Sequence, residues 1–268
     1  MLIFMIKLKK KNSQIRQLGG ETIYGKFAYV YDKLMRDIDY VKWADYIERI
    51  FKRFECAPNL IADLACGTGS FCIEMDKRGY EMIGIDLSPD MLACASEKAH
   101  TAKADVLWLN QDMTEFELYG TVDAVVCLLD SVNNITKPER LLKMFGLVRN
   151  YLNPGGLFIF DVNTSHKLKN VLGNNVFYSV DDDVVYIWQC SFDAKTAVSK
   201  FDLTFFTREG KLYDRFDEVH FERAYESNEI QLLITESGLE LLDRYEEMSF
   251  KKPEPCSERT FYVCRRPQ

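Results

Sequence analysis

Apolar stretches alternate with helical stretches between residues 60 and 164, and this alternation constrains the fold more than any other feature of the sequence. It is typical of right-handed βαβ units and a parallel sheet. Because the strands are apolar almost throughout, we expect helices to cover both faces of the sheet. The first strand begins at residue 60, the others span 81–88, 106–112, 122–129 and 157–164, and the helices span 70–77, 89–102 and 137–151.

From about residue 175 the pattern changes to aromatic- and valine-rich segments separated by short turns, which predicts an antiparallel sheet. These segments lie at 176–180, 184–192, 198–210 and 215–225, and a helix at 227–237 and strands at 239–246 and 259–266 follow. We therefore predict an α/β fold. Its doubly wound, mostly parallel, seven-stranded sheet is Rossmann-like, with an antiparallel β insertion after strand five.

The N-terminal part has its own pattern. Apolar residues recur at helical spacing from residue 22 to 54, and the acidic break at Asp37–Asp39 predicts two short helices. The first residues place a short apolar run before the basic run, which is the reverse of a signal peptide. We expect an N-terminal extension (1–20), a core with a helical cap (21–174 and 226–268) and a β-rich insertion that forms a substrate lid (175–225).

Composition excludes several functional classes. The formal net charge is −7 and the sequence pI is about 5.2, which argues against a duplex-binding protein. The eight cysteines form no CxxC pair, so we predict no metal site and reduced thiols in a cytoplasmic protein. No apolar run is long enough to span a membrane.

The stretch LIADLACGTGS (60–70) carries a glycine turn at the end of the first strand. A dinucleotide site needs a third glycine, but Cys72 stands three residues after Gly69. A Walker loop needs a lysine, and Thr68-Gly69-Ser70 has none. Both phosphate-binding interpretations are therefore weakened.

Two acids at strand ends indicate a nucleoside instead. Asp86 lies 23 residues after Asp63, where a carboxylate can accept two hydrogen bonds from ribose hydroxyls. Asp112 ends the third strand and can accept a hydrogen bond from an adenine amino group, with Met113 against the ring. The sequence thus predicts a ligand with ribose and adenine but no phosphate.

Taken together, DLACGTG (63–69), GIDLS (84–88), QDM (111–113) and NPGG (153–156) resemble the class I S-adenosylmethionine-dependent methyltransferases. The resemblance covers roughly residues 22–268. More narrowly, the N-terminal YGKFAYVYDKLM, the DSVNNI loop and the VHFERAY segment resemble an uncharacterised bacterial family. That family is similar to glycine and sugar N-methyltransferases, which close a β-rich lid over a small substrate.

The resemblance implies S-adenosylmethionine as cofactor and assigns roles to individual residues. Asp63 would orient the methionine amino group, Asp86 would bind ribose, and the Leu128 carbonyl would accept from the amino group. Trp43 would help close the helical cap, although aromatic residues at helical spacing are more often core. The implied cofactor-binding residues are Tyr24, Trp43, Asp63, Ala65, Gly67, Gly69, Asp86, Leu87, Met91, Gln111, Asp112, Met113 and Leu128.

Methyl transfer from a sulfonium is an in-line displacement, so the protein mainly aligns the nucleophile and excludes water. A general base is needed only if the nucleophile arrives protonated. The predicted catalytic residues are Asp130 and Asn133, after the fourth strand, and His220, in the insertion. His220 has an alternative interpretation as a solvated sheet residue. Further polar candidates are Ser131, Asn134, Asp161, Asn163 and Glu222.

The methyl acceptor is not encoded by a motif. The loop after strand four reads LDSVNN, without the Pro-Pro-Tyr/Phe or Pro-Cys elements found in relatives that modify nucleic-acid bases. We expect transfer to a nitrogen or oxygen of a small molecule, with a nucleic-acid partner disfavoured and no membrane partner. An RNA or protein methyltransferase and a non-catalytic cofactor-binding regulator remain alternatives. The oligomeric state stays open.

Overall fold

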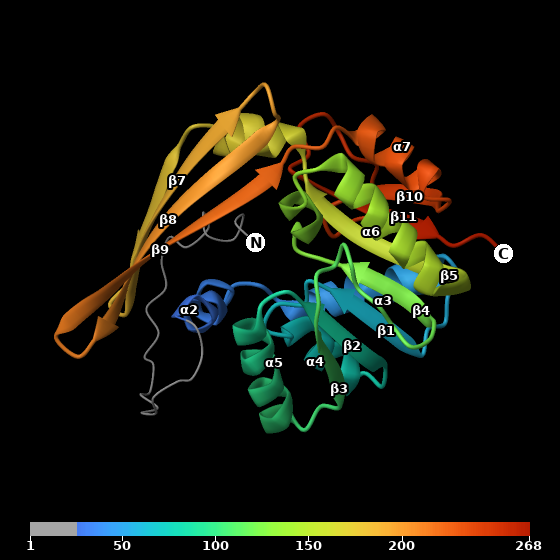
Figure 1. Ribbon diagram of the computed structural model, residues 1–268, viewed down its shortest axis with the longest axis horizontal. Coiled ribbons are helices and arrows are strands. Elements are labelled where there is room, and N and C mark those ends of the chain that lie inside the picture. The colour runs from blue at the N-terminus through green and yellow to red at the C-terminus, as the bar shows by residue number, and fades with distance from the viewer. Residues whose placement is uncertain (1–25) are drawn as a thin grey trace.

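The structure is a computed structural model that describes residues 26–268. Seven strands form one sheet in the order β10-β11-β5-β4-β1-β2-β3 (Figure 1). Strands β1 to β5 run parallel, and β11 pairs antiparallel with β5 and β10. The predicted doubly wound α/β fold is confirmed. The strands are β1 (Leu60–Leu64), β2 (Glu81–Asp86), β3 (Val106–Asn110), β4 (Val122–Cys127), β5 (Leu152–Asn163), β10 (Glu240–Glu246) and β11 (Arg259–Arg265).

Helices cover both faces of this sheet, as the apolar strands predict. On one face, Phe145 and Ile230 of α6 and α7 pack in the same cluster as Phe158 of β5. On the other face, Ile47 of α3 and Phe71 of α4 pack with residues of β1 and β4. The helices are α3 (Tyr40–Arg53), α4 (Ser70–Lys77), α5 (Pro89–Ala102), α6 (Pro138–Tyr151) and α7 (Ser227–Glu236).

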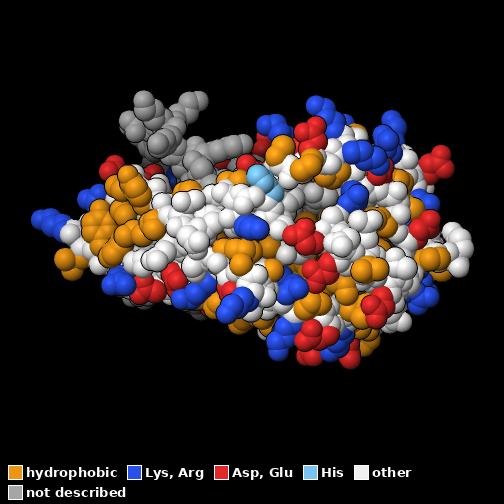
Figure 2. Space-filling view, turned by 90° about the horizontal axis from the view of Figure 1, so that it is seen from above, with side chains coloured by type: hydrophobic (Ala, Val, Ile, Leu, Met, Phe, Trp, Pro, Cys, Tyr) orange, Lys and Arg blue, Asp and Glu red, His pale blue; other side chains and the backbone are white. Residues whose placement is uncertain are grey.

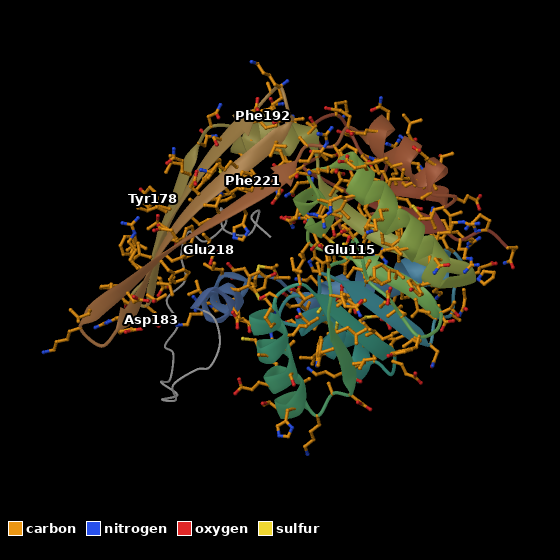
Figure 3. The ribbon with its side chains drawn as sticks, viewed as in Figure 1. Glu115, Tyr178, Asp183, Phe192, Glu218 and Phe221 are labelled. Carbon is orange, nitrogen blue, oxygen red and sulfur yellow. The ribbon has the colours of Figure 1, made fainter. Side chains whose placement is uncertain are left out.

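The insertion after β5 is a four-stranded antiparallel sheet in the order β6-β7-β8-β9, as predicted (Figure 1). Its inner face is a cluster that includes Trp188 and Phe201, whereas Tyr178 and Phe221 on its outer face are exposed (Figure 3). Hydrophobic side chains gather at this end of the molecule (Figure 2). Its strands are β6 (Val176–Val180), β7 (Val184–Asp193), β8 (Val198–Glu209) and β9 (Leu212–Arg223).

Helix α2 (Lys26–Leu34) lies between the insertion and the core (Figure 1). Val30 and Leu34 join the inner cluster of the insertion, while Ala28 packs with Met91 of α5. The predicted break between two N-terminal helices is confirmed, because α2 ends at Leu34 and α3 begins at Tyr40. The expected extension at 1–20 and Tyr24 lie outside the described residues.

Two local features differ from the sequence-based expectation. Strand β5 begins at Leu152 rather than at residue 157, because Leu152 pairs with Val122 of β4. A short π-helix, η2 (Lys167–Leu172), precedes the insertion and was not expected. Across residues 26–268, no helix is long and apolar enough to cross a membrane.

Candidate active site

The glycine turn follows β1 at the carboxyl edge of the sheet. Ala65, Gly67 and Gly69 all have a positive φ, of 57°, 56° and 71°. A Cβ added at Gly69 would lie 2.3 Å from Cη2 of Trp108, so only glycine fits there. Ala65 adopts the left-handed conformation despite its Cβ, at a cost of about 1 kcal/mol. The turn therefore brings bare backbone to the end of β1.

Asp86 ends β2 and is joined to the glycine turn. Its carboxylate accepts the Gly67 N–H and the Ser88 N–H, each at 2.8 Å. Burial raises the pKa of Asp86. Two predicted neighbours differ in exposure: Leu87 is 68% exposed, and Met91 is buried in α5. The sheet edge thus presents a carboxylate beside an open backbone turn.

The loop after β3 carries Asp112. Its carboxylate accepts from the Thr114 N–H and hydroxyl, both at 2.8 Å, and from Nη2 of Arg140 at 2.7 Å. Burial acts to raise the pKa of Asp112, but the Thr114 bonds and Arg140 lower it below its usual value. Gln111 holds the same loop through two bonds to the Glu117 backbone, at 2.7 and 3.3 Å. Half-buried Met113 packs against the core.

Asp63 lies beneath the glycine turn and is almost fully buried. Burial raises its pKa to about 7. The Cys72 thiol donates to its Oδ2 at 3.3 Å. Trp43, which was expected to help close the cap, is 2% exposed and packs 5.5 Å from the Phe261 ring, centroid to centroid. The structure therefore places Trp43 in the core.

Helix α2 covers the glycine turn through residues that sequence reasoning did not select. The Tyr31 hydroxyl lies 3.7 Å from the position of a Cβ at Gly67. Lys98 of α5 donates to both Asp32 carboxylate oxygens at 3.0 Å and to the Thr68 hydroxyl at 2.9 Å. In the sequence, Tyr31 and Asp32 are an aromatic and an acidic residue near the end of a predicted helix. This pair could have indicated that the helix contacts the glycine turn.

The loop after β4 turns sharply. Leu129 and Asp130 have φ of 59° and 58°, two consecutive left-handed residues without glycine. Asp161 of β5 accepts both of their N–H groups, at 2.8 and 2.9 Å. The Ser131 hydroxyl donates to the Leu128 carbonyl at 2.8 Å. Because such backbone costs of order 1–3 kcal/mol per residue, the two hydrogen bonds to Asp161 help to stabilise the turn.

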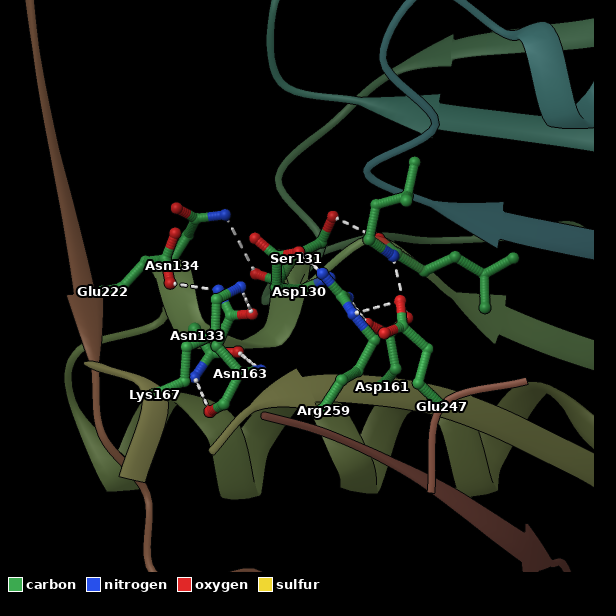
Figure 4. Close-up of polar contacts among 12 residues, drawn as sticks. Asp130, Ser131, Asn133, Asn134, Asp161, Asn163, Lys167, Glu222, Glu247 and Arg259 are labelled. Carbon is green, nitrogen blue, oxygen red and sulfur yellow. Dashed lines mark hydrogen bonds and ion pairs between the residues drawn. The ribbon is translucent and has the colours of Figure 1, made fainter. Parts of the chain in front are cut away.

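Arg259, the first residue of β11, joins the two acids of this region (Figure 4). It donates to Asp130 Oδ1 at 2.5 Å and to Asp161 Oδ2. All three side chains are buried, and burial raises the pKa of Asp161 even beside Arg259. Arg259 was missed because its partners are far away in the sequence. Asp130, the predicted base, is thus one member of a buried ion-pair cluster.

A second polar network joins the core to the insertion (Figure 4). Asn163 donates to Glu222 Oε2 at 2.7 Å, and Lys167 donates to Asn163 Oδ1 at 2.6 Å. Asn133 donates to the carbonyls of Asn163 and Arg223, at 3.0 and 2.9 Å, and its own oxygen accepts the Asn163 N–H. Asn133, a predicted catalytic residue, therefore clamps three segments together.

Burial shifts the acidity of this network. It raises the pKa of Glu222 to about 7 and lowers that of Lys167 to about 8. His220 lies two residues before Glu222 on the same face of β9, and burial lowers its pKa. The predicted His220 is half-buried rather than fully solvated. A titratable face of the insertion therefore adjoins the loops after β4 and β5.

The arrangement suits a nucleoside better than a polyphosphate. Gly67 is only half-buried and leaves backbone accessible, whereas buried Gly69 lets the turn pack against Trp108, and Asp86 and Asp112 offer acceptors at neighbouring strand ends. Lys98, a cation that the described residues place at this turn, is already bonded to Asp32. S-adenosylmethionine carries adenosine and a methionine unit but no phosphate, so the residues present fit it.

Comparisons with known proteins agree with this geometry. Residues 61–156 match the family described as "Methyltransferase domain". "Putative methyltransferase YqeM" of Bacillus subtilis is 36% identical over 246 residues, which is 91% of this chain and 97% of that protein. An N,N-dimethyltransferase of Streptomyces venezuelae, named for a dTDP-3-amino sugar, is 31% identical over 137 residues, which is 50% of this chain and 56% of that protein.

A crystal structure of an S-adenosylmethionine-dependent methyltransferase from Clostridium acetobutylicum is also similar. It is 37% identical, with a TM-score of 0.84 over 91% of this chain and 98% of its own. The two chains therefore share their fold over nearly their whole lengths. The chain therefore belongs to the class I S-adenosylmethionine-dependent methyltransferases, and its cofactor is S-adenosylmethionine.

Proposed function

We propose that the protein transfers the methyl group of S-adenosylmethionine to a nitrogen or oxygen of a small molecule. The observation that carries this proposal is the Asn133–Asn163–Glu222 network, which fastens the inner face of the insertion to the loops after β4 and β5. A sheet fastened in this way encloses the space beside the cofactor, which suits a small acceptor. The amino-sugar relative from Streptomyces venezuelae supports the same acceptor class.

We assign the cofactor to the edge formed by β1 to β4. Asp86 would accept the ribose hydroxyls, while Asp112 and Met113 would hold adenine. Gly67 and Gly69 would give backbone contact, with Ala65, Leu87, Met91 and Gln111 lining the site, and Tyr31 would cover the turn. Asp63 and the Leu128 carbonyl would accept hydrogen bonds from the amino group of the methionine unit. The bound cofactor supplies an electrophilic methyl group, and the chain holds the acceptor in line with it.

The loop residues expected to be catalytic take a positioning role in this proposal. The Asp130 carboxylate is bonded to Arg259, which stabilises its charge and makes it a weak base. Both polar atoms of the Asn133 side chain are bonded to backbone. His220 lies on the inner face of β9 and would help line the acceptor side.

The test uses methyl-labelled S-adenosylmethionine and a cell extract separated into small molecules, RNA and protein. We expect the purified protein to place label in the small-molecule fraction. Label confined to RNA or protein would overturn the acceptor class. Binding of the cofactor without transfer to any fraction would instead indicate a regulator.

A further inference from the structure

Glu222 is a buried carboxylate with too few partners. Its side chain is 2% exposed, and its one hydrogen bond with the described residues is from Asn163 Nδ2 at 2.7 Å. Among residues 26–268, no basic side chain forms an ion pair with it. A carboxylate removed from water without a cation or several donors is unfavourable. The chain therefore maintains a costly group at the junction of the insertion and the core.

Among residues 26–268, the charges that face Glu222 do not neutralise it. Asp130 contributes repulsion from the loop after β4, and Lys167 of η2 contributes attraction from beyond Asn163. The Cys190 thiol faces it from β7, and His220 lies beside it on β9. Arg259 is occupied by Asp130 and Asp161. Within the part of the chain that the structure describes, this region thus has an excess of carboxylates over cations, and it would favour a ligand that brings a positive charge.

We propose, on the basis of the proposed function, that the methyl acceptor is a small amine and that Glu222 takes its proton. The ammonium form of the acceptor enters the acidic site, and its N–H bond breaks as the proton moves to a Glu222 carboxylate oxygen. The nitrogen lone pair then forms the new N–CH3 bond. The S–CH3 bond breaks, and its electron pair stays on sulfur.

Glu222 suits this role better than its neighbours do. A base must be available to accept a proton at the operating pH, and a carboxylate that is already paired with a cation is a poor acceptor. Asp130 and Asp161 are both held by Arg259. Asn163 lies between Lys167 and Glu222, with one polar atom bonded to each, so it fixes the orientation of the Glu222 carboxylate. No hydrogen bond from a residue within 26–268 reaches Glu222 Oε1, and this oxygen would receive the ligand.

The test compares wild-type protein with Glu222→Gln, using methyl-labelled S-adenosylmethionine and the small-molecule fraction of a cell extract. Glutamine keeps the shape and can still accept from Asn163. We expect labelled products in the wild-type reaction to be amines, retained on a cation exchanger. In the variant the rate at neutral pH falls at least 100-fold, as expected for loss of a general base. Cofactor affinity stays within twofold, and the inflection of the wild-type rate near pH 7, which reports the Glu222 carboxyl, disappears.

Glu209→Gln, at the exposed tip of the β8–β9 hairpin, is the matched control and keeps wild-type rates. Thermal melting shows that each variant is folded. Label on oxygen of a small molecule, or full turnover by Glu222→Gln, would overturn this proposal while the proposed function stands. Label only in RNA or protein, or in no fraction, would overturn the proposed function and this inference with it.

Discussion

Replacing Arg259 with methionine tests whether the buried ion-pair cluster supports the active-site loop. The guanidinium is fully buried and bonded to Asp130 and Asp161, whose side chains are 1% and 0% exposed. Methionine keeps the apolar stem but removes the guanidinium that both buried carboxylates bind. Breaking a buried pair in this way costs about 3–5 kcal/mol, a large part of the roughly 5–15 kcal/mol that stabilises a folded domain.

The assay is urea unfolding followed by circular dichroism, with thermal melting alongside. We expect Arg259→Met to lose about 4 kcal/mol, which lowers the melting temperature by about 10 °C in a chain of this size. The control is Arg215→Met, because Arg215 pairs with Asp217 on the exposed surface. An exposed pair contributes about 0–1 kcal/mol.

The stability that Arg259→Met loses depends on pH in a predictable way. Without Arg259 the folded-state pKa of Asp161, which burial already raises, rises further, and the pKa of Asp130 loses the lowering by the guanidinium, so Asp161 above all protonates more readily in the folded protein than in the unfolded chain. The variant then loses stability as pH rises above about 4, which is the pKa of an aspartic acid in the unfolded chain. The variant should therefore be closer to wild type at pH 5 than at pH 8. A loss below about 1 kcal/mol, or one independent of pH, would refute the reasoning.

Three further predictions follow from local geometry. Gly69→Ala should prevent both correct folding of the turn and cofactor binding, because the added Cβ would lie 2.3 Å from Trp108. The control is Gly210→Ala, where φ is +65° and the space is open, and it should lower the free energy of unfolding in urea by only about 1 kcal/mol. Asn133→Ala should cost about 3 kcal/mol by leaving the buried Asn163 N–H without a partner. Exposed Asn134→Ala, which loses one bond to Ser131, should cost under about 1 kcal/mol, and equal losses would contradict the clamp. Glu222→Gln should be more stable than wild type by about 3 kcal/mol at pH 8 but not at pH 4. The reason is that the Glu222 carboxyl has a raised pKa of about 7 in the folded protein, so wild type loses stability as pH rises from about 4.5 to 7. Identical melting curves across this pH range would disprove that shift.

The sequence identifies features that depend on neighbouring residues. Helix α5 begins at Pro89 as predicted, because Ser88 accepts the Met91 N–H at 3.3 Å. The glycine turn and Asp86 were likewise recognisable, since strand, turn and acid follow one another along the chain. Such local patterns were sufficient for the fold class and for the edge of the sheet that carries the site.

Long-range pairings were not recognisable. Arg259 lies 98 and 129 residues from its partners Asp161 and Asp130, and it meets them because β11 pairs antiparallel with β5. Polar residues in a loop suggested catalysis for Asn133, whereas burial gives it three bonds to backbone. The burial of Glu222 depends on how the insertion packs against the core. No local pattern encodes that packing.

Calorimetric titration of S-adenosylmethionine tests the cofactor site most directly. Wild type is expected to bind one molecule per chain. Asp86→Asn should weaken binding by at least 10-fold, because charge-assisted hydrogen bonds contribute about 1.5–3 kcal/mol each. Asp90→Asn, an exposed acid in the first turn of α5, should bind as wild type does. If Asp86→Asn melts like wild type and binds the cofactor with unchanged affinity, the assignment of the cofactor to this edge of the sheet is wrong.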